Sequence, residues 1–259
     1  MTASAEEFDI ASTDKHLLEK ATRVAREFAR RYATDEVVGI VFLGAVARGY
    51  FDESADIDIA VFKKRSAAMP LPAKFSKVEG LEVHCWLSDF EDELAGPWDM
   101  AKRWTFSQSQ AFYDPQGDVA RLLEEKVPLK SDERKRLLMV GLVLSEWYVN
   151  RLAGLWVKRG NIVSAHHMFC QGLDYFSEML FALNNRLVPD TKWRYYCLER
   201  LPLRPSGFRD GVRDTMTLHS FSPAELERRQ NAFMALWQEM RPVVETELQM
   251  TFDEMLQVV

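Results

Sequence analysis

An apolar run that stops at a glycine constrains the fold of this chain most strongly. Val37–Leu43 (VVGIVFL) is short, nearly continuous and rich in branched residues, and Gly44 follows it directly. Such a run is typical of a buried β-strand. The segment Ile57–Phe62 predicts a second strand, and Leu81–Leu87, whose side chains alternate between two faces, predicts a third. This part of the chain is therefore expected to fold around a sheet.

Helical patterns surround these strands. A first helix is predicted after Ser12 or Thr13, either of which can cap it. Its apolar residues recur at three- and four-residue steps and form one face: Leu17, Leu18, Ala21, Val24, Phe28 and Tyr32. The proline-containing segment Lys63–Lys77 is expected to be a loop, and Asp89–Leu94 and Trp98–Phe112 are expected to be helices over the sheet.

The second half of the chain shows no strand pattern. Long apolar patterns predict helices at Ser131–Lys158 and Ile162–Arg186, and a third helix begins at Ser222 and is kinked or ended by Pro242. We therefore predict an α+β protein. A mixed sheet with flanking helices occupies residues 1–128, and an all-α helical bundle occupies residues 129–259.

Composition excludes several classes of protein. The net charge of −6 argues against a sequence-independent nucleic-acid coat, which requires a basic excess. Met1–Ile10 lacks the apolar core of a signal peptide, and no apolar run reaches the ~20 residues of a membrane span. The distant cysteines Cys85, Cys170 and Cys197 form neither a disulfide framework nor a metal knuckle. A cytoplasmic protein without nucleic-acid or membrane partners is expected.

Asp56 and Asp58 form the most informative chemical pattern. Residues two apart in a strand share a face, so the two carboxylates should project together. Two carboxylates this close repel each other unless a cation lies between them. Two divalent ions would relieve that repulsion, activate an attacking hydroxyl and neutralise a triphosphate leaving group.

Residues on either side of this pair extend the pattern. A strand that runs into Gly44 and a helix start presents backbone N–H groups to phosphate oxygens, and Arg48 adds a charged donor. A third carboxylate is expected on a neighbouring strand, where Glu82 is flanked by apolar residues. His84 shares the face of Glu82 and is interpreted as a surface histidine.

These residues resemble the DNA polymerase beta-like nucleotidyltransferase superfamily. Its signature is an apolar strand, Gly-Ser, roughly ten residues and then Asp-x-Asp, and the Ala47–Arg48–Gly49 segment resembles the minimal and antibiotic-modifying branches. The resemblance implies that Asp56, Asp58 and Glu82 hold two Mg²⁺ ions, with ATP as substrate.

The resemblance also implies that Gly44 forms the phosphate-binding turn and that Ala45 and Arg48 belong to the nucleotide site. The chain departs from the pattern at Ala45, where the family has a serine. A neutral hydrogen bond to the nucleotide, worth about 0.5–1.5 kcal/mol, is thereby absent.

The helical half carries a weaker likeness. Leu180–Pro202 resembles a segment that faces the active cleft in antibiotic nucleotidyltransferase-like proteins, which implies that Lys192 reaches the triphosphate. The catalytic base would come from this half, and Glu146, Asp174 and Glu178 are all open as candidates.

The expected activity is transfer of a nucleoside monophosphate, AMP from ATP, to a hydroxyl of a small-molecule or protein acceptor. Pyrophosphate would leave. Two alternatives of other classes stay open: a non-catalytic nucleotide-binding regulator, suggested by Ala45, and an antitoxin-like interaction module in which the helical half binds a protein. No motif in the sequence identifies the acceptor.

Overall fold

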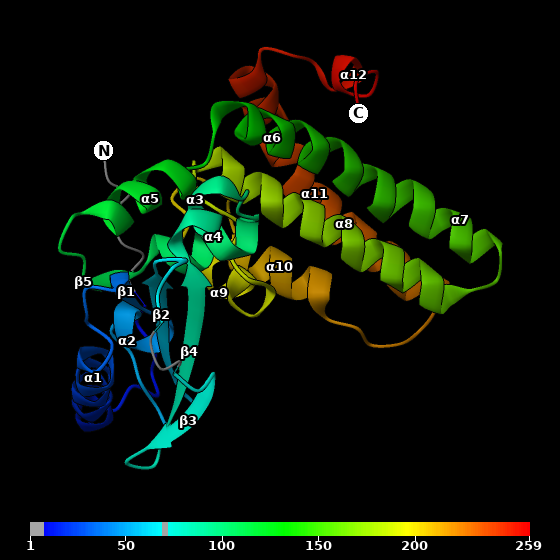
Figure 1. Ribbon diagram of the computed structural model, residues 1–259. Coiled ribbons are helices and arrows are strands. Elements are labelled where there is room, and N and C mark those ends of the chain that lie inside the picture. The colour runs from blue at the N-terminus through cyan, green and yellow to red at the C-terminus, as the bar shows by residue number, and fades with distance from the viewer. Residues whose placement is uncertain (1–7, 69–71) are drawn as a thin grey trace. The chain divides into compact units, whose positions relative to one another are not determined.

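The chain folds into two compact units, Met1–Pro128 and Leu129–Val259. The computed structural model describes residues 8–68 and 72–259. The first unit contains a five-stranded mixed sheet with flanking helices, and the second consists of helices and connecting loops (Figure 1). This architecture confirms the α+β fold class that the sequence predicts.

The sheet combines parallel and antiparallel pairing. Its strands are β1 (Val37–Leu43), β2 (Ile57–Lys63), β3 (Phe75–Val78), β4 (Leu81–Asp89) and β5 (Gln110–Tyr113). They lie in the order β3-β4-β2-β1-β5. Strands β2 and β4 are parallel, and every other neighbouring pair is antiparallel. Buried partners such as Ile59 and Cys85 lie opposite each other and hold β2 and β4 in register.

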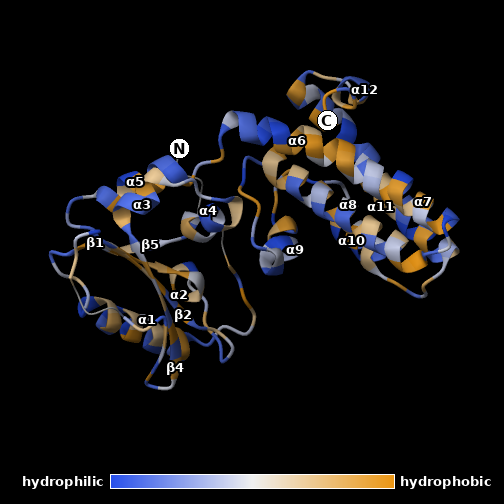
Figure 2. Ribbon diagram, turned by 45° about the vertical axis from the view of Figure 1, so that its right-hand side comes forward, coloured by the Kyte–Doolittle hydropathy of each residue, from blue (hydrophilic) through white to orange (hydrophobic). Residues whose placement is uncertain are grey.

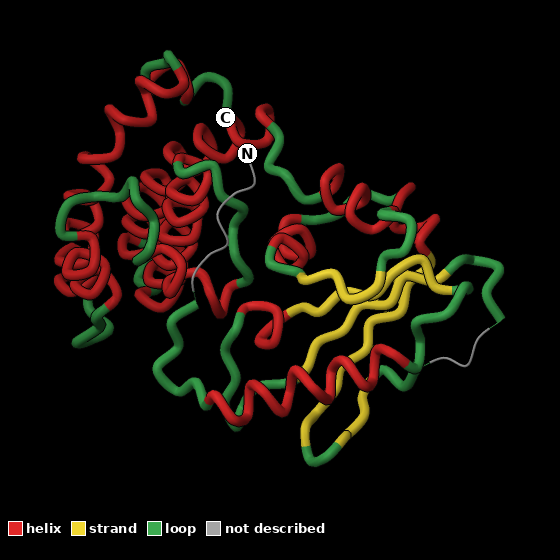
Figure 3. Tube along the Cα trace, turned by 90° about the vertical axis from the view of Figure 1, so that its left-hand side faces the viewer, coloured by secondary structure: helices red, strands yellow, loops and turns green. Residues whose placement is uncertain are grey.

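One face of the sheet is covered by α1 (Lys15–Arg30), which lies along the strands in Figure 3. Its buried Ala21, Val24 and Phe28 recur at the helical period and pack against the sheet. The helix cap is Asp14, whose carboxylate accepts the first free backbone N–H groups, so the predicted cap at Ser12 or Thr13 was wrong.

The opposite face is covered by helices that follow β4. These are α3 (Phe90–Ala95), α4 (Met100–Ser107) and α5 (Asp118–Lys126), and the short α2 (Gly44–Arg48) joins β1 to the loop before β2. Trp98, Phe106 and Leu122 pack there against Val41 and Phe62. The central strands β1 and β2 are therefore buried on both faces along most of their length, as their continuous apolar runs require.

Two segments of the first unit differ from prediction. The expected loop Lys63–Lys77 contains the start of β3; residues 69–71 of that loop, including Pro70, lie outside the described residues. Strand β3 turns into β4 through Glu79 and Gly80, which both have positive φ and suit a tight hairpin. The expected helix Trp98–Phe112 ends at Ser107, because Gln110–Tyr113 pairs with the edge of β1 as β5.

The second unit is built around paired long helices. Its elements are α6 (Ser131–Glu146), the π-helical stretch η1 (Trp147–Leu152), α7 (Ala153–Lys158), α8 (Ile162–Leu183), the 3₁₀ turn η2 (Thr191–Trp193), α9 (Arg194–Leu198), α10 (Phe208–Met216), α11 (Pro223–Leu248) and α12 (Phe252–Met255). The predicted helix at Ser131–Lys158 is confirmed, with a π-helical stretch in its middle, and the helix predicted at Ile162–Arg186 is confirmed up to Leu183, where it ends. The short elements between α8 and α11 carried no clear periodicity and were not predicted.

Helix α11 runs past Pro242 without ending there. Met240 and Val244, which flank the proline, are both buried, so packing holds the helix together where one backbone hydrogen bond is lost. Figure 2 shows the alternation of polar and apolar residues around the helices of this unit. Among the described helices, none has both the length and the apolar character that crossing a membrane demands.

Candidate metal and nucleotide site

Two aspartates stand at the start of β2, on the sheet face opposite α1. Asp56 directly precedes the strand and Asp58 is its second residue. Ile57 and Ile59 point the other way into the core against α1, where both are fully buried. The alternation predicted from the sequence thus places both carboxylates on one face, and their side chains are 39% and 23% exposed, respectively.

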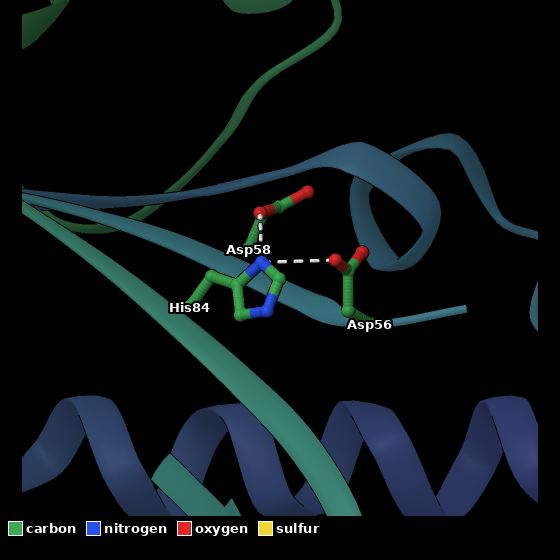
Figure 4. Close-up of side chains that lie close together, drawn as sticks. All are labelled: Asp56, Asp58 and His84. Carbon is green, nitrogen blue, oxygen red and sulfur yellow. Dashed lines mark ion pairs between the residues drawn. The ribbon is translucent and has the colours of Figure 1, made fainter. Parts of the chain in front are cut away.

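His84 completes the group from the neighbouring strand. In the parallel pairing of β2 and β4, His84 lies directly opposite Asp58. Its Nδ1 is 2.9 Å from Asp56 Oδ2 and 3.7 Å from Asp58 Oδ1 (Figure 4). The exposed Phe75 of β3 meets the imidazole edge-to-face, with ring centres 4.8 Å apart. The interpretation of His84 as an ordinary surface histidine does not describe this position.

Glu82 shares the sheet face but stays at the margin of the group. Its side chain is 71% exposed, and its Oε2 lies 4.0 Å from His84 Nε2, on the side of the ring away from the aspartates. The donor atoms that converge within 4.8 Å come from Asp56, Asp58 and His84, the one such set in residues 8–68 and 72–259. The structure therefore brings together two of the three predicted ligands and adds His84.

Gly44 makes room for Asp58. Residue 43 pairs with Asp58 across β1 and β2, so Gly44 lies beside the carboxylate. Gly44 has φ +56°, and a Cβ at this position would overlap Asp58 Oδ2. Only glycine combines this left-handed backbone with so close an approach. The glycine that the sequence singled out for phosphate binding thus also shapes the aspartate pair.

Ala45 and Arg48 are both packed into the first unit. Ala45 is buried in the core cluster beneath α2. The Arg48 guanidinium lies over the rings of Phe8 and Trp104, at 4.9 Å and 4.1 Å from their centres. Such cation–π contacts stabilise a half-buried guanidinium. They hold the Arg48 side chain against the protein.

Further aromatic residues border the site on β3 and β4. Trp86 follows His84 on the same face, and its indole N–H points to Asp58 Oδ1 at 3.5 Å. Lys74 Nζ lies 5.3 Å from the ring centre of Phe75 and 5.9 Å from that of Trp86. Both rings are more than half exposed, so apolar surface adjoins the carboxylates on the side away from Gly44.

The remaining predicted residues lie in the helical unit. Lys192 is exposed in η2, where its backbone N–H is capped by Asp190. Asp174 and Glu178, one turn apart on α8, both face Arg194, with their nearest carboxylate oxygens 3.1 Å and 3.7 Å from its Nη1. Burial raises the pKa of Glu178, an effect that Arg194 partly opposes.

Glu146, the other base candidate, ends α6. Its carboxylate accepts a hydrogen bond from Asn150 at 3.2 Å. None of these contacts selects one base among Glu146, Asp174 and Glu178.

The residues of the first unit fit a divalent cation. Bonds of roughly 2.0–2.2 Å place two ligands of one ion roughly 2.8–4.4 Å apart. The two distances from His84 Nδ1 to the aspartate oxygens, 2.9 Å and 3.7 Å, fall within that range. A bound cation would also relieve the repulsion between the carboxylates.

The chain was compared with family models, curated proteins and solved structures. No family model matches the sequence, and no curated protein matches it. Among solved structures, the chain is similar to a nucleotidyltransferase-like protein from Exiguobacterium sibiricum 255-15, with 11% identity and a TM-score of 0.47. The alignment covers 89% of this chain and 78% of that one.

Proposed function

We propose that this protein is a divalent-metal-dependent nucleotidyltransferase. It would transfer a nucleoside monophosphate, AMP from ATP, to a hydroxyl of a small antibiotic-like molecule or of a protein, and release pyrophosphate. The observation that carries the proposal is the convergence of Asp56, Asp58 and His84 beside the Gly44 turn. The strand, glycine and Asp-x-Asp order of the sequence supports it independently.

In this proposal, residues of the first unit bind the metal and the phosphates. Asp56 and Asp58 would hold the cation, for which the sequence predicts a pair of Mg²⁺ ions. A bound divalent ion supplies charge neutralisation for the phosphates and lowers the pKa of a hydroxyl. Gly44 lets the β1–α2 backbone approach the carboxylates without a side chain between them, so phosphate oxygens could lie against both.

The helical unit would contribute the acceptor side of the reaction. Lys192 is proposed as a cationic contact for the triphosphate, and one of Glu146, Asp174 and Glu178 as the general base. Burial raises the pKa of Glu178, which is the direction in which a general base is tuned. Alanine substitution of each of the three in turn distinguishes them.

The proposal is tested by pyrophosphate release. The purified protein is screened with each nucleoside triphosphate, with Mg²⁺ or Mn²⁺, against a panel of hydroxyl acceptors. Asp58→Ala and Asp56→Asn should each lose at least about a hundredfold in rate, since the stabilisation removed is several kcal/mol. Asp52→Asn is the matched control, because the Asp52 carboxylate accepts hydrogen bonds from the Ser12 hydroxyl and the Ser54 backbone N–H and is not among the converging donor groups. An Asp58→Ala protein that keeps the wild-type rate contradicts the proposal.

A second candidate function is a non-catalytic nucleotide-binding regulator. The alanine at position 45 favours it, because the resemblance places a serine there and the hydroxyl that would contact a phosphate is missing. This candidate predicts saturable ATP binding by calorimetry and no pyrophosphate release with any acceptor. Release with one acceptor excludes it.

A further inference from the structure

The third donor atom of the site is a nitrogen, which bears on the choice of metal. Mg²⁺ takes oxygen ligands and is usually held by one or two carboxylates together with water and phosphate. Imidazole ligands suit Zn²⁺ and other first-row transition-metal ions. We propose that His84 Nδ1 is a metal ligand and that the site prefers a first-row transition-metal dication to Mg²⁺. The proposal deepens the function proposed above, but metal binding is measurable without turnover.

The geometry supports His84 as a ligand in three ways. Its Nδ1 faces both aspartates, at 2.9 Å and 3.7 Å. Its position opposite Asp58 is set by the buried pairing of β2 with β4, so the donors converge on a rigid sheet. The ring is also restrained by Phe75, which packs edge-to-face against it. A neutral imidazole that carries its proton on Nε2 then directs the Nδ1 lone pair at the aspartates.

Glu82 has a distinct part in this arrangement. Its Oε2 lies 4.0 Å from His84 Nε2, the ring nitrogen that faces away from the aspartates. A carboxylate that accepts a hydrogen bond from the second nitrogen of a ligating histidine fixes the proton there and raises the basicity of the ligating nitrogen, and a small rotation of the exposed Glu82 side chain would bring it within that distance. Glu82 is therefore a positioning residue, which acts on the metal through His84, and the ligand role expected from the sequence passes to the histidine.

The preference is measured by calorimetric titration of the full chain with Zn²⁺, Mn²⁺ and Mg²⁺ in the absence of nucleotide. Wild type should bind Zn²⁺ and Mn²⁺ more tightly than Mg²⁺. His84→Asp replaces the nitrogen by oxygen and should lower the ratio of Zn²⁺ to Mg²⁺ affinity at least about tenfold. His84→Asn, of similar size and uncharged, should lower Zn²⁺ affinity by a similar factor. His167→Asp, at an exposed histidine of α8, makes the same exchange outside the site and should change neither affinity.

Direct ligation has a spectroscopic signature. In protein labelled with ¹⁵N at its five histidines, Zn²⁺ should shift the Nδ1 resonance of one ring, and that resonance should be missing from His84→Asn. Mg²⁺ at equal occupancy should shift it far less. Circular dichroism and the urea midpoint of each variant show whether the fold is retained, so a lost signal is not mistaken for unfolding.

The role of Glu82 is tested by two variants. Glu82→Ala should weaken Zn²⁺ binding about tenfold and leave Mg²⁺ binding unchanged, whereas Glu82→Gln, which keeps the side-chain length and an oxygen near Nε2, should restore most of the loss. Equal weakening of both ions by Glu82→Ala would mean that Glu82 is itself a ligand.

Two results overturn the proposal as a whole. One is an affinity ratio unchanged in His84→Asp. The other is a wild-type protein that binds none of the three ions. His84 would then serve only as the ion-pair partner of Asp56 and Asp58. Failure of the transferase proposal is distinguishable from either, because it appears as absent pyrophosphate release from a protein that binds metal as described.

Discussion

Replacement of Gly44 by alanine tests the packing of the candidate site most directly. Gly44 and Gly49 lie at the two ends of α2 and both have positive φ, +56° and +78°. They differ in their surroundings: a Cβ on Gly44 would overlap Asp58 Oδ2 and lie 3.2 Å from Asp58 Cγ, whereas a Cβ on Gly49 would meet nothing within 4 Å. Gly49→Ala is therefore a control for backbone strain alone.

The expected magnitudes follow from this difference. Left-handed backbone destabilises alanine by about 1–2 kcal/mol, and the stiffer unfolded chain returns about 0.4–1 kcal/mol. Gly49→Ala should then lower the free energy of unfolding by about 1 kcal/mol. Gly44→Ala adds the crowding of Asp58, and overpacking of this kind costs about 1–3 kcal/mol more.

Urea denaturation in the presence of a chelator measures the loss of folding stability in each variant, independently of metal binding and of activity. Zn²⁺ titration measures the effect on metal binding: Asp58 must move away from the new methyl group, so Gly44→Ala should lose at least about tenfold in affinity while Gly49→Ala loses none. Equal unfolding free energies for the two variants would refute the argument that Gly44 is required by the position of Asp58.

Two further predictions concern the helical unit. The Glu225 carboxylate accepts hydrogen bonds from Arg228 and from the backbone of His219, which lowers its pKa from 4.5 to about 2. The ionised Glu225 carboxylate thus stabilises the fold above pH 4.5, and this contribution is lost as the pH falls towards 2. Between pH 4.5 and 2, the free energy of unfolding should therefore fall less in Glu225→Gln than in wild type. The control is Glu227→Gln, at an exposed residue, which should follow wild type. Gly172→Ala should lower the free energy of unfolding by about 1–3 kcal/mol, because the new Cβ would lie 2.9 Å from Ser145 O and against Val149. Gly154→Ala has open space around it and should raise the free energy of unfolding by up to about 1 kcal/mol. Equal urea midpoints for the two variants would contradict this packing.

Most of the sheet could be predicted because its strands are apolar runs with clear ends. The segments that were predicted wrongly, β3 and β5, are edge strands of four residues each. Their side chains are mostly exposed or half-buried, so they leave no apolar period, and they become strands only through pairing with β4 and β1. Local sequence carries little information about such tertiary pairing.

The roles of Ala45 and Arg48 depended on packing in the same way. A short helix after a glycine turn indicates a phosphate site, but which of its side chains face outward depends on the layer beneath it. Ala45 faces the core, and the Arg48 guanidinium is covered by Phe8 from the N-terminal segment and by Trp104 from α4. Neither aromatic neighbour is close to Arg48 in sequence, so no local pattern could have revealed the contacts.

The sequence pattern does not determine whether Glu82 or His84 lies opposite Asp58. Alternation places Glu82 and His84 on one face of β4, and a shift of β4 by two residues against β2 would bring Glu82 opposite Asp58 while every apolar side chain still faced the core. The hydrophobic pattern therefore excludes a shift of one residue but not of two. In the observed register Val83 lies opposite Ile57 and Cys85 lies opposite Ile59, all buried in the core beneath α1, and packing of this kind depends on side-chain shape in three dimensions. The register decides whether Glu82 or His84 lies opposite Asp58, and under the metal-site proposal it therefore also decides whether the third donor is an oxygen or a nitrogen.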